Sequence, residues 1–381
     1  MNPKFSPRDP SMHATFSHGE ICNVQILRGL AAIFVIFYHI YLWEGKNFGR
    51  GWASPNFFRI GDAGVDIFFT ISGFIMVYIQ PKALSDWTNY RRFILNRITR
   101  IFPPYWIVSL ALLPLWILRP DLFNNFYHNQ VDIVRSFLLL PQNYTPLHGV
   151  GWTLIHELYF YFVVSFALLF GFRTRILFGL IWGGIILLVN FWLGDNAGRS
   201  SPFLQLCLSP FSLTFLLGYF VGLFSTLPLQ FPNKVHYTIL LAGVLLLIYA
   251  FYFPPPGGVY PNNNSLRRFI MYGLPGAAFL FAFIGLEKSW RGHFRIFEKI
   301  GNASYSIYLT HLPLIAAIYA LFSKTLPPAL SSHPPVLIGI GILSLCVSIL
   351  AGVIFHLWIE LPSVKLARSL CGVTNRKMPA T

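Results

Sequence analysis

The residues best suited to chemistry are ionisable side chains inside long apolar segments. In the segment RGLAAIFVIFYH, Arg28 and His39 are eleven residues apart. At 3.6 residues per turn, this spacing puts both on one helix face, separated along the axis by about 16 Å. An imidazole titrates near neutral pH and can act as a general base, so an anion held at Arg28 could extend a neutral arm towards His39. The alternative is that both are buried polar groups that satisfy neighbouring helices.

Two further apolar segments contain carboxylates. GVDIFFTISGF includes Asp66 and Ser72, and GWTLIHELYFY includes Glu157, with Tyr161 one helical turn beyond it. A charged side chain costs roughly 2.5 to 3.5 kcal/mol at the centre of a membrane helix, so it normally faces a cavity or a partner. Glu157 is therefore a candidate to orient His39 or an acceptor hydroxyl. A carboxylate paired only for packing would give the same pattern.

Arginine and histidine motifs complete the set of candidates. Arg97 and Arg100 are spaced i and i+3, so both guanidinium groups can bind one phosphate cluster. A basic helix that meets anionic lipid headgroups has the same composition.

In SYSIYLTHLP, Tyr308 and His311 lie along one side of a helix and are supporting candidates, with helix capping and pairing as alternatives. No cysteine or histidine spacing predicts a metal site or a disulfide.

Membrane helices must position these residues. Of the 381 residues, 55% are hydrophobic and only 11% are charged, which excludes an ordinary water-soluble domain. Apolar runs of about 20 residues recur along the chain and predict an all-α polytopic membrane protein with about ten transmembrane helices. The predicted spans are 24–43, 62–80, 102–119, 149–170, 175–194, 203–225, 237–253, 268–286, 303–322 and 336–359.

The distribution of charge predicts the orientation. With ten spans both termini lie on one side, and about two thirds of the 28 lysines and arginines fall on that side. The positive-inside rule therefore predicts cytoplasmic termini, although Arg267 and Arg268 run against it.

The basic residues form short clusters between apolar runs, which argues against a nucleic-acid partner. Residues 85–101 predict an amphipathic helix on the cytoplasmic membrane surface. The predicted organisation is a polar cytoplasmic segment (1–20), a transmembrane domain (21–362) and a basic cytoplasmic tail (363–381).

Five blocks together resemble the acyltransferase-3 family of bacterial integral-membrane O-acyltransferases, especially its exopolysaccharide and lipopolysaccharide O-acetyltransferases. The resemblance covers most of the chain. The blocks are RGLAAIFVIFYH at 28–39, GVDIFFTISGF at 64–74, RITR at 97–100 with FPPYW shortly after it, GWTLIHELYFY at 151–161, and SYSIYLTHLP at 304–313.

The resemblance implies a ten-helix enzyme of the bacterial cytoplasmic (inner) membrane. It would take an acyl group, acetyl by default, from cytoplasmic acyl-coenzyme A (acyl-CoA) and pass it to a hydroxyl of an extracytoplasmic polysaccharide or glycolipid. Acyl-CoA would be a co-substrate, and no tightly bound cofactor is implied. His39 would be catalytic, and Arg28, Arg97 and Arg100 would bind the donor. Glu157, Asp66 and Tyr308 carry over more weakly. The chain ends shortly after the last span, so we expect no appended extracytoplasmic domain.

The competing class is a transporter or flippase for a glycan or anionic small molecule. Such proteins also place buried charges near the middle of the membrane, on helices interrupted by glycine or proline. The glycines of the second span and Pro275 of the eighth would suit this class. Against it, the two halves of the sequence contain no corresponding pair of interrupted segments, and the Arg97/Arg100 pair has no evident role in transport.

Overall fold

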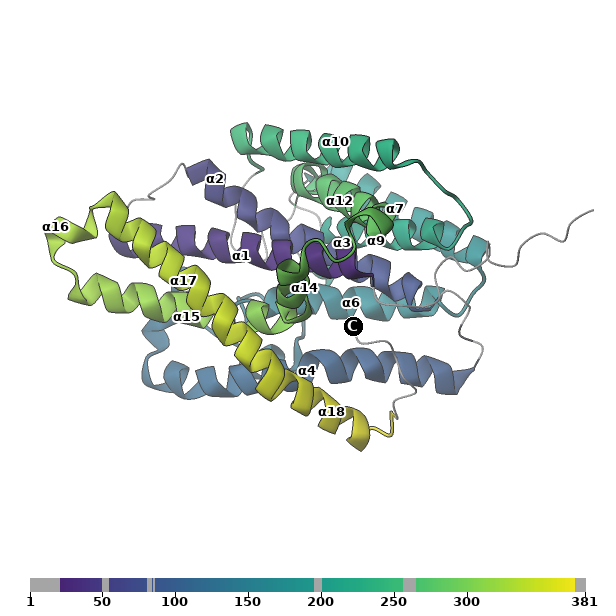
Figure 1. Cartoon of the computed structure of the whole chain (residues 1–381). Helices are drawn as coiled ribbons and strands as arrows, with labels where there is room; N and C mark the ends of the chain where they lie inside the picture. Colours follow the sequence, from purple (N-terminus) through teal and green to yellow (C-terminus); the bar gives the residue numbers. More distant parts are fainter. Residues whose placement is uncertain are drawn as a thin grey trace, which may run out of the picture.

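Helices account for the regular structure of the part of the chain that a computed structural model describes, residues 21–49, 55–80, 84, 86–194, 201–255 and 265–373 (Figure 1). The polar segment 1–20 lies outside these residues. The longer helices are α1 (Cys22–Phe48), α3 (Ala63–Tyr78), α4 (Trp87–Leu118), α6 (Gly151–Ala167), α7 (Phe172–Leu193), α9 (Phe211–Ser225), α10 (Asn233–Tyr252), α12 (Leu274–Gly285), α15 (Ser304–Thr325) and α17 (Pro334–Phe355). The shorter ones are α2 (Pro55–Arg59), α5 (Ile133–Leu138), α8 (Pro202–Cys207), α11 (Leu266–Arg268), α13 (Glu287–Trp290), α14 (Arg295–Asn302), α16 (Pro328–Ser331) and α18 (Leu361–Leu370).

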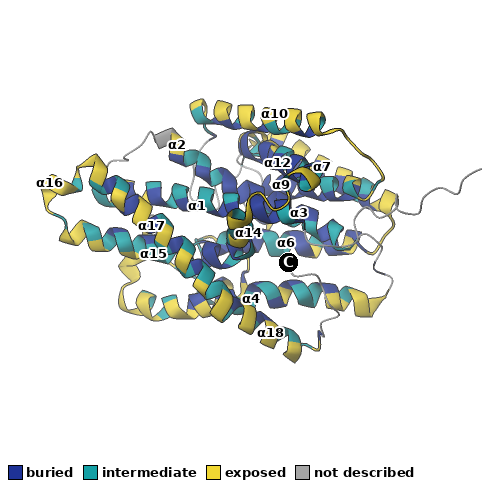
Figure 2. Ribbon diagram, viewed as in Figure 1, coloured by how far each residue is buried: buried dark blue, intermediate teal, exposed yellow. Residues whose placement is uncertain are grey.

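The described helices confirm an all-α, multi-pass membrane protein. Within the described ranges, nine helical segments are long and apolar enough to cross a membrane by length and composition. The fourth predicted span, 149–170, is not among these nine, because it corresponds to α6, which has only 17 residues. Large apolar side chains on the outer faces of α7 and α10 are exposed, among them Phe191, Trp192 and Leu245 (Figure 2). In a water-soluble protein such faces would be an aggregation hazard, whereas in a bilayer they contact lipid tails.

One helix, α4, joins two elements that the sequence analysis separates. The predicted amphipathic helix at 85–101 and the span at 102–119 form a single helix of 32 residues that continues through Pro103 and Pro104. It begins at Asp86, whose side chain accepts a hydrogen bond from the backbone N–H of Asn89, as helix N-caps commonly do. Phe93 is buried, so this half of the helix packs into the bundle. Arg97 is therefore buried in the bundle, whereas Arg91 and Arg92 on the same helix are exposed.

The predicted C-terminal tail is also partly helical. A π-helical segment (His356–Glu360) connects α17 to α18, so the chain remains helical through Leu370. Helix α18 packs against α4, and its residue Val364 is buried. Residues 374–381 lie outside the described residues. The first part of the predicted tail (363–381) is thus helical and packs against the bundle.

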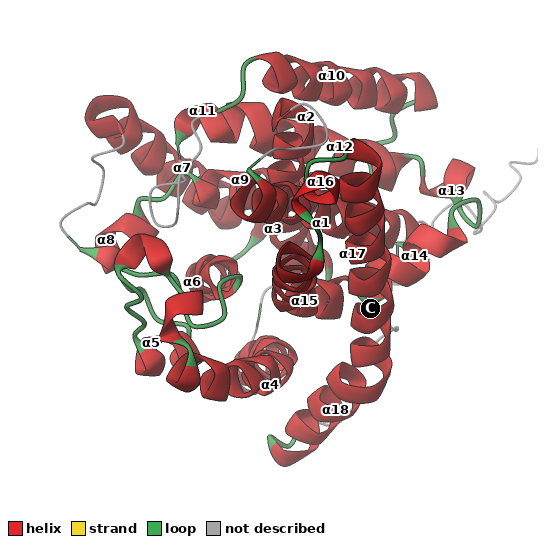
Figure 3. Cartoon of the chain, turned by 90° about the vertical axis from the view of Figure 1, so that its left-hand side faces the viewer, coloured by secondary structure: helices red, strands yellow, loops and turns green. Residues whose placement is uncertain are grey.

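Small residues set the closest contact between helices, that of α3 with α9. A Cβ atom on Gly73 would lie 2.0 Å from the carbonyl oxygen of Phe215, and one on Gly218 would lie 1.7 Å from that of Thr70. Both separations are far below van der Waals contact, so these positions require glycine. The close approach holds α3, which carries Ser72, at the centre of the bundle (Figure 3).

Hydrogen bonds link neighbouring helices around the central part of the bundle. Tyr305 of α15 donates a hydrogen bond to the carbonyl oxygen of Ile101 in α4, at 2.7 Å. The hydroxyl groups of Thr153 in α6 and Tyr308 in α15 are 2.8 Å apart. These bonds tie α15 to both α4 and α6, and α1 packs against α15 and α3. The five helices α1, α3, α4, α6 and α15 therefore surround one region of the protein.

The predicted membrane orientation can be tested by cysteine labelling. After removal of the four native cysteines, we expect Gly49→Cys and a cysteine at position 258, which lies outside the described residues, to react with an impermeant maleimide added from the extracytoplasmic side. Arg173→Cys, in the first turn of α7, should react only after the membrane is opened, because the positive-inside rule predicts that the connection between α6 and α7 lies in the cytoplasm. Labelling of position 258 from the cytoplasmic side alone would contradict this orientation.

Candidate active site

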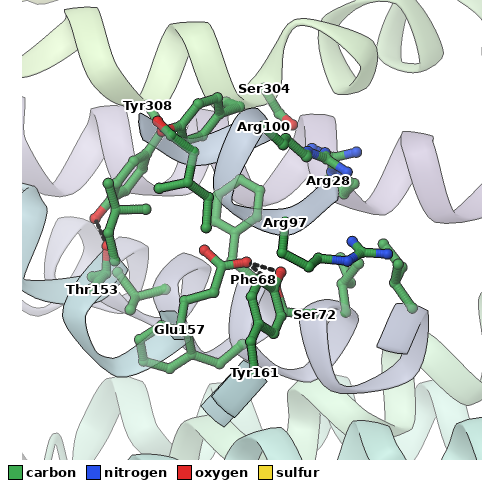
Figure 4. A pocket seen from close by; sticks show the side chains of 17 residues that line it. Arg28, Phe68, Ser72, Arg97, Arg100, Thr153, Glu157, Tyr161, Ser304 and Tyr308 are labelled. Carbon is green, nitrogen blue, oxygen red and sulfur yellow. Dashed lines mark hydrogen bonds between the residues drawn. The ribbon is translucent and has the colours of Figure 1, made fainter. Parts of the chain in front are cut away.

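A pocket lies among α1, α3, α4, α6 and α15 (Figure 4). It brings together six of the nine residues that the sequence suggests, from all five helices. These are Arg28, Ser72, Arg97, Arg100, Glu157 and Tyr308. Figure 4 shows the three arginines on one side of the pocket and Thr153 and Tyr308 on the other. The pocket is thus cationic at one end and lined by hydroxyl groups at the other.

The cationic end contains buried arginines that outnumber the carboxylates within electrostatic range of them, Glu157 and Glu360. Arg28 and Arg97 are 7% and 6% exposed. Arg28 donates a hydrogen bond to the side chain of Gln25, at 3.1 Å, and Nε of Arg97 has no hydrogen-bond partner among the described residues. The charges of both are close enough to Arg100 to repel it. Within the described part of the chain none of the three forms an ion pair. Buried, mutually repelling cations favour a bound anion.

A fourth arginine, Arg368 of α18, was missed by the sequence analysis. Its charge also lies within electrostatic range of Arg100, and its Nε has no partner in the described residues. Arg368 comes close because α18 packs on α4. The sequence feature that could have indicated this is the stretch LPSVKLARSL at 361–370. In it, Val364 and Arg368 are one helical turn apart, as in a helix that packs one face against the bundle.

Glu157 is the carboxylate that lines the pocket. It accepts a hydrogen bond from Ser72, at 2.8 Å, and a short one from Tyr161. The guanidinium of Arg97 lies 5.6 Å from the centre of the Tyr161 ring, in a cation–π arrangement. From the sequence, Glu157 is a candidate to orient either His39 or an acceptor hydroxyl. Its hydrogen bonds go to Ser72 and Tyr161 instead of His39, so the first of these roles does not match the structure.

His39 lies beyond the hydroxyl end of the pocket, paired with His311. Nδ1 of His39 is 3.2 Å from Nε2 of His311, and the two ring centres are 4.8 Å apart. Neither histidine lines the pocket. Tyr308 connects the two regions, since it lines the pocket and its ring centre is 5.6 Å from that of His311. Tyr308 therefore lies between the pocket and the histidine pair. Arg28, at the cationic end, and His39 are on the same helix, α1.

Asp66 does not belong to this pocket. It forms an ion pair with Arg268 at 2.7 Å, and Arg268 also pairs closely with Asp62. Arg268 is 3% exposed, and its guanidinium lies over the rings of Phe211 and Tyr272. The prediction of Asp66 as a supporting site residue therefore does not fit its place, because its charge serves a buried ion cluster. The two aspartates compensate the charge of Arg268, which offers a reason why an arginine is tolerated at a helix end that the charge distribution predicts to be extracytoplasmic.

Comparisons with known proteins place the chain among acyltransferases. The exopolysaccharide production protein ExoZ of Rhizobium meliloti is 34% identical over 118 residues, which are 29% of this chain and 35% of that protein. The peptidoglycan O-acetyltransferase OatA of Listeria monocytogenes is 22% identical over 348 residues, which are 82% of this chain and 52% of that protein. The chain thus spans about half or less of the length of these relatives. No solved structure matches it.

The family comparison agrees with the five blocks and with the helices that carry them. The blocks contribute Arg28, Ser72, Arg97, Arg100, Glu157 and Tyr308 to one pocket, and a family model described as an acyltransferase domain matches residues 23–353. With most of its length covered by that match, this multi-pass membrane protein belongs to the acyltransferase-3 family.

Proposed function

We propose that the protein is a membrane-bound O-acyltransferase of the bacterial cytoplasmic membrane. It transfers an acyl group, acetyl by default, from cytoplasmic acyl-CoA to a hydroxyl of an extracytoplasmic polysaccharide or glycolipid. The observation that carries the proposal is the cluster of three arginines at one end of the pocket, none of which forms an ion pair among the described residues. One of them, Arg28, lies on α1, the helix that also bears His39. The names of the relatives, which refer to exopolysaccharide production and to peptidoglycan O-acetylation, support a carbohydrate acceptor.

The arginines would bind the phosphates of the donor. Guanidinium groups suit this role because they donate paired hydrogen bonds to phosphate oxygens and remain charged when buried. From Arg28, the neutral pantetheine arm would run along α1 towards His39, over the roughly 16 Å that eleven residues of helix span. Tyr308 stands at the end of the pocket nearest the histidines. The thioester must therefore pass beside the Tyr308 ring to reach His39.

The transfer itself requires a base and a leaving-group acid. In the proposed reaction His39 takes the proton of the acceptor hydroxyl as its oxygen attacks the thioester carbonyl carbon. The C–S bond then breaks, and the coenzyme A sulfur takes the proton back from the His39 imidazolium. The products are the O-acyl ester and free coenzyme A, so atoms and charge balance. Glu157, through its hydrogen bonds with Ser72 and Tyr161, shapes the pocket through which the arm passes.

Acyl transfer by the purified protein tests this proposal against transport. The protein in detergent micelles is given acetyl-CoA labelled in the acetyl group together with oligosaccharide fragments of bacterial surface glycans. An enzyme releases free coenzyme A and labels the sugar without a sealed compartment, whereas a transporter or flippase needs one. Labelled sugar that also appears with the His39→Gln protein would point to a contaminating enzyme. Folded protein that neither labels any acceptor nor hydrolyses the donor would contradict the proposal.

Arg368 provides a prediction that the sequence alone does not make. We expect Arg368→Ala to raise the KM for acyl-CoA about tenfold and to leave the KM for the acceptor unchanged, because one charge-assisted hydrogen bond to phosphate contributes about 1.5 to 3 kcal/mol. Lys365→Ala is the matched control, since Lys365 is an exposed cation on the same helix. Equal effects of the two substitutions would mean that α18 acts through its general positive charge and not through Arg368.

A further inference from the structure

The histidine pair joins α1 to α15 deep in the bundle. Nδ1 of His39 and Nε2 of His311 are 3.2 Å apart. His311 is completely buried, whereas His39 is only partly buried. A neutral imidazole has one protonated and one unprotonated nitrogen, and the hydrogen bonds of one nitrogen determine the state of the other. The surroundings of the two rings therefore determine which nitrogen can take a proton.

The protonation state of His311 follows from its own helix. Its Nδ1 is 2.8 Å from the carbonyl oxygen of Tyr308 and 3.2 Å from that of Ile307. A carbonyl oxygen only accepts hydrogen bonds, so Nδ1 of His311 must carry the hydrogen. In the neutral ring, Nε2 of His311 is then unprotonated. It presents its lone pair to His39.

The same argument assigns the protonation state of His39. Its Nδ1 is 2.9 Å from the carbonyl oxygen of Val35 and 3.2 Å from Nε2 of His311. Both neighbours are acceptors, so Nδ1 of His39 must be a donor. Nε2 of the neutral His39 ring is therefore the unprotonated nitrogen. It is the nitrogen of the pair that is free to act as a base, because the lone pair of His311 already accepts from His39.

We propose that His311 is a positioning residue. Together with the carbonyl oxygen of Val35, it holds His39 in its Nδ1–H form and leaves Nε2 of His39 to take the proton of the acceptor hydroxyl. The inference rests on the proposed function. In this role His311 resembles the third member of a hydrolase triad, which fixes the tautomer of the catalytic histidine and stabilises the imidazolium that forms. A neutral imidazole replaces the carboxylate here, which avoids a buried negative charge inside the membrane.

Two substitutions of His311 separate positioning from packing. His311→Phe fills the space but removes the acceptor, so we expect kcat to fall at least tenfold with the KM for acyl-CoA unchanged. His311→Gln retains an oxygen that can accept from Nδ1 of His39, so it should recover a large part of that loss. His236→Phe is the control, since His236 is another buried histidine, on α10, outside the pocket. A residue that only packs would give equal losses with Phe and Gln, and that result would overturn the proposal.

The tautomer can be measured without relying on activity or on the folding of His311 variants. The protein labelled with ¹⁵N-histidine is compared with the same sample carrying His39→Gln, and the signals that disappear belong to His39. We expect them to show a protonated Nδ1 and an unprotonated Nε2, and the opposite assignment would overturn the inference. If His39→Gln keeps full acyl transfer, the base of the proposed function is wrong. If His39→Gln is inactive while both His311 variants keep the wild-type kcat, only the role of His311 is wrong.

Discussion

The variant His39→Gln is expected to remain inserted and folded but to lose acyl transfer by about 10² to 10⁴-fold, the usual contribution of a general base. Glutamine keeps much of the size and hydrogen-bonding capacity of histidine and cannot take a proton near neutral pH. Its amide can still donate to the carbonyl oxygen of Val35, which lies 2.9 Å from the ring in the wild type. The measurement is the initial rate of labelled acetyl transfer by the purified variant, with His39→Ala assayed beside it.

Donor binding should survive this substitution. The arginines that would hold the phosphates line the pocket, whereas His39 lies beyond Tyr308. Binding of acetyl-CoA to His39→Gln, measured by calorimetry in detergent, is therefore expected to match that of the wild type. A packing role for His39 leads to the reverse pattern, in which Gln stays active while Ala lowers expression and melting temperature. Near-native transfer by the Gln variant would remove His39 from the mechanism.

Features within one helix were predictable from the sequence. Arg28 and His39 lie on α1 as expected, because the spacing of two residues on a continuous helix follows from helical geometry alone. Arg97 and Arg100 likewise line the same pocket from α4. The sequence motifs also identify Ser72, Glu157 and Tyr308 as candidate site residues. Each of these inferences needs only local periodicity and the cost of burying polar groups.

Features that join distant helices were not predictable. The contact of His39 with His311 links residues 272 positions apart, and its geometry depends on the depth and rotation at which α1 packs against α15. Asp66 was assigned to the site because an intramembrane carboxylate indicates function by default, but its partner Arg268 is 202 residues away. Arg368 was assigned to a tail, since only the packing of α18 on α4 shows that it approaches Arg100.

The double variant Arg97→Ala, Arg100→Ala is expected to lower kcat/KM for acyl-CoA by roughly a hundredfold or more, because each guanidinium offers charge-assisted hydrogen bonds of about 1.5 to 3 kcal/mol to phosphate. The KM for the acceptor should stay close to that of the wild type. Lysine at both positions should restore only part of the loss, since an ammonium group keeps the charge but lacks the paired geometry.

Two comparisons separate phosphate binding from contact with lipid headgroups. Arg91 and Arg92 are exposed on the same helix and do not line the pocket, so Arg91→Ala, Arg92→Ala removes two surface charges and should leave donor use unchanged. A short acetyl thioester without phosphates, S-acetylpantetheine, should serve the Arg97→Ala, Arg100→Ala variant and the wild type equally well, because it has no group for these arginines to hold. If the pocket variant instead keeps the wild-type KM for acyl-CoA while folded, the two arginines do not bind the donor. Their charge would then serve the membrane surface, as in the basic helices that contact anionic lipid.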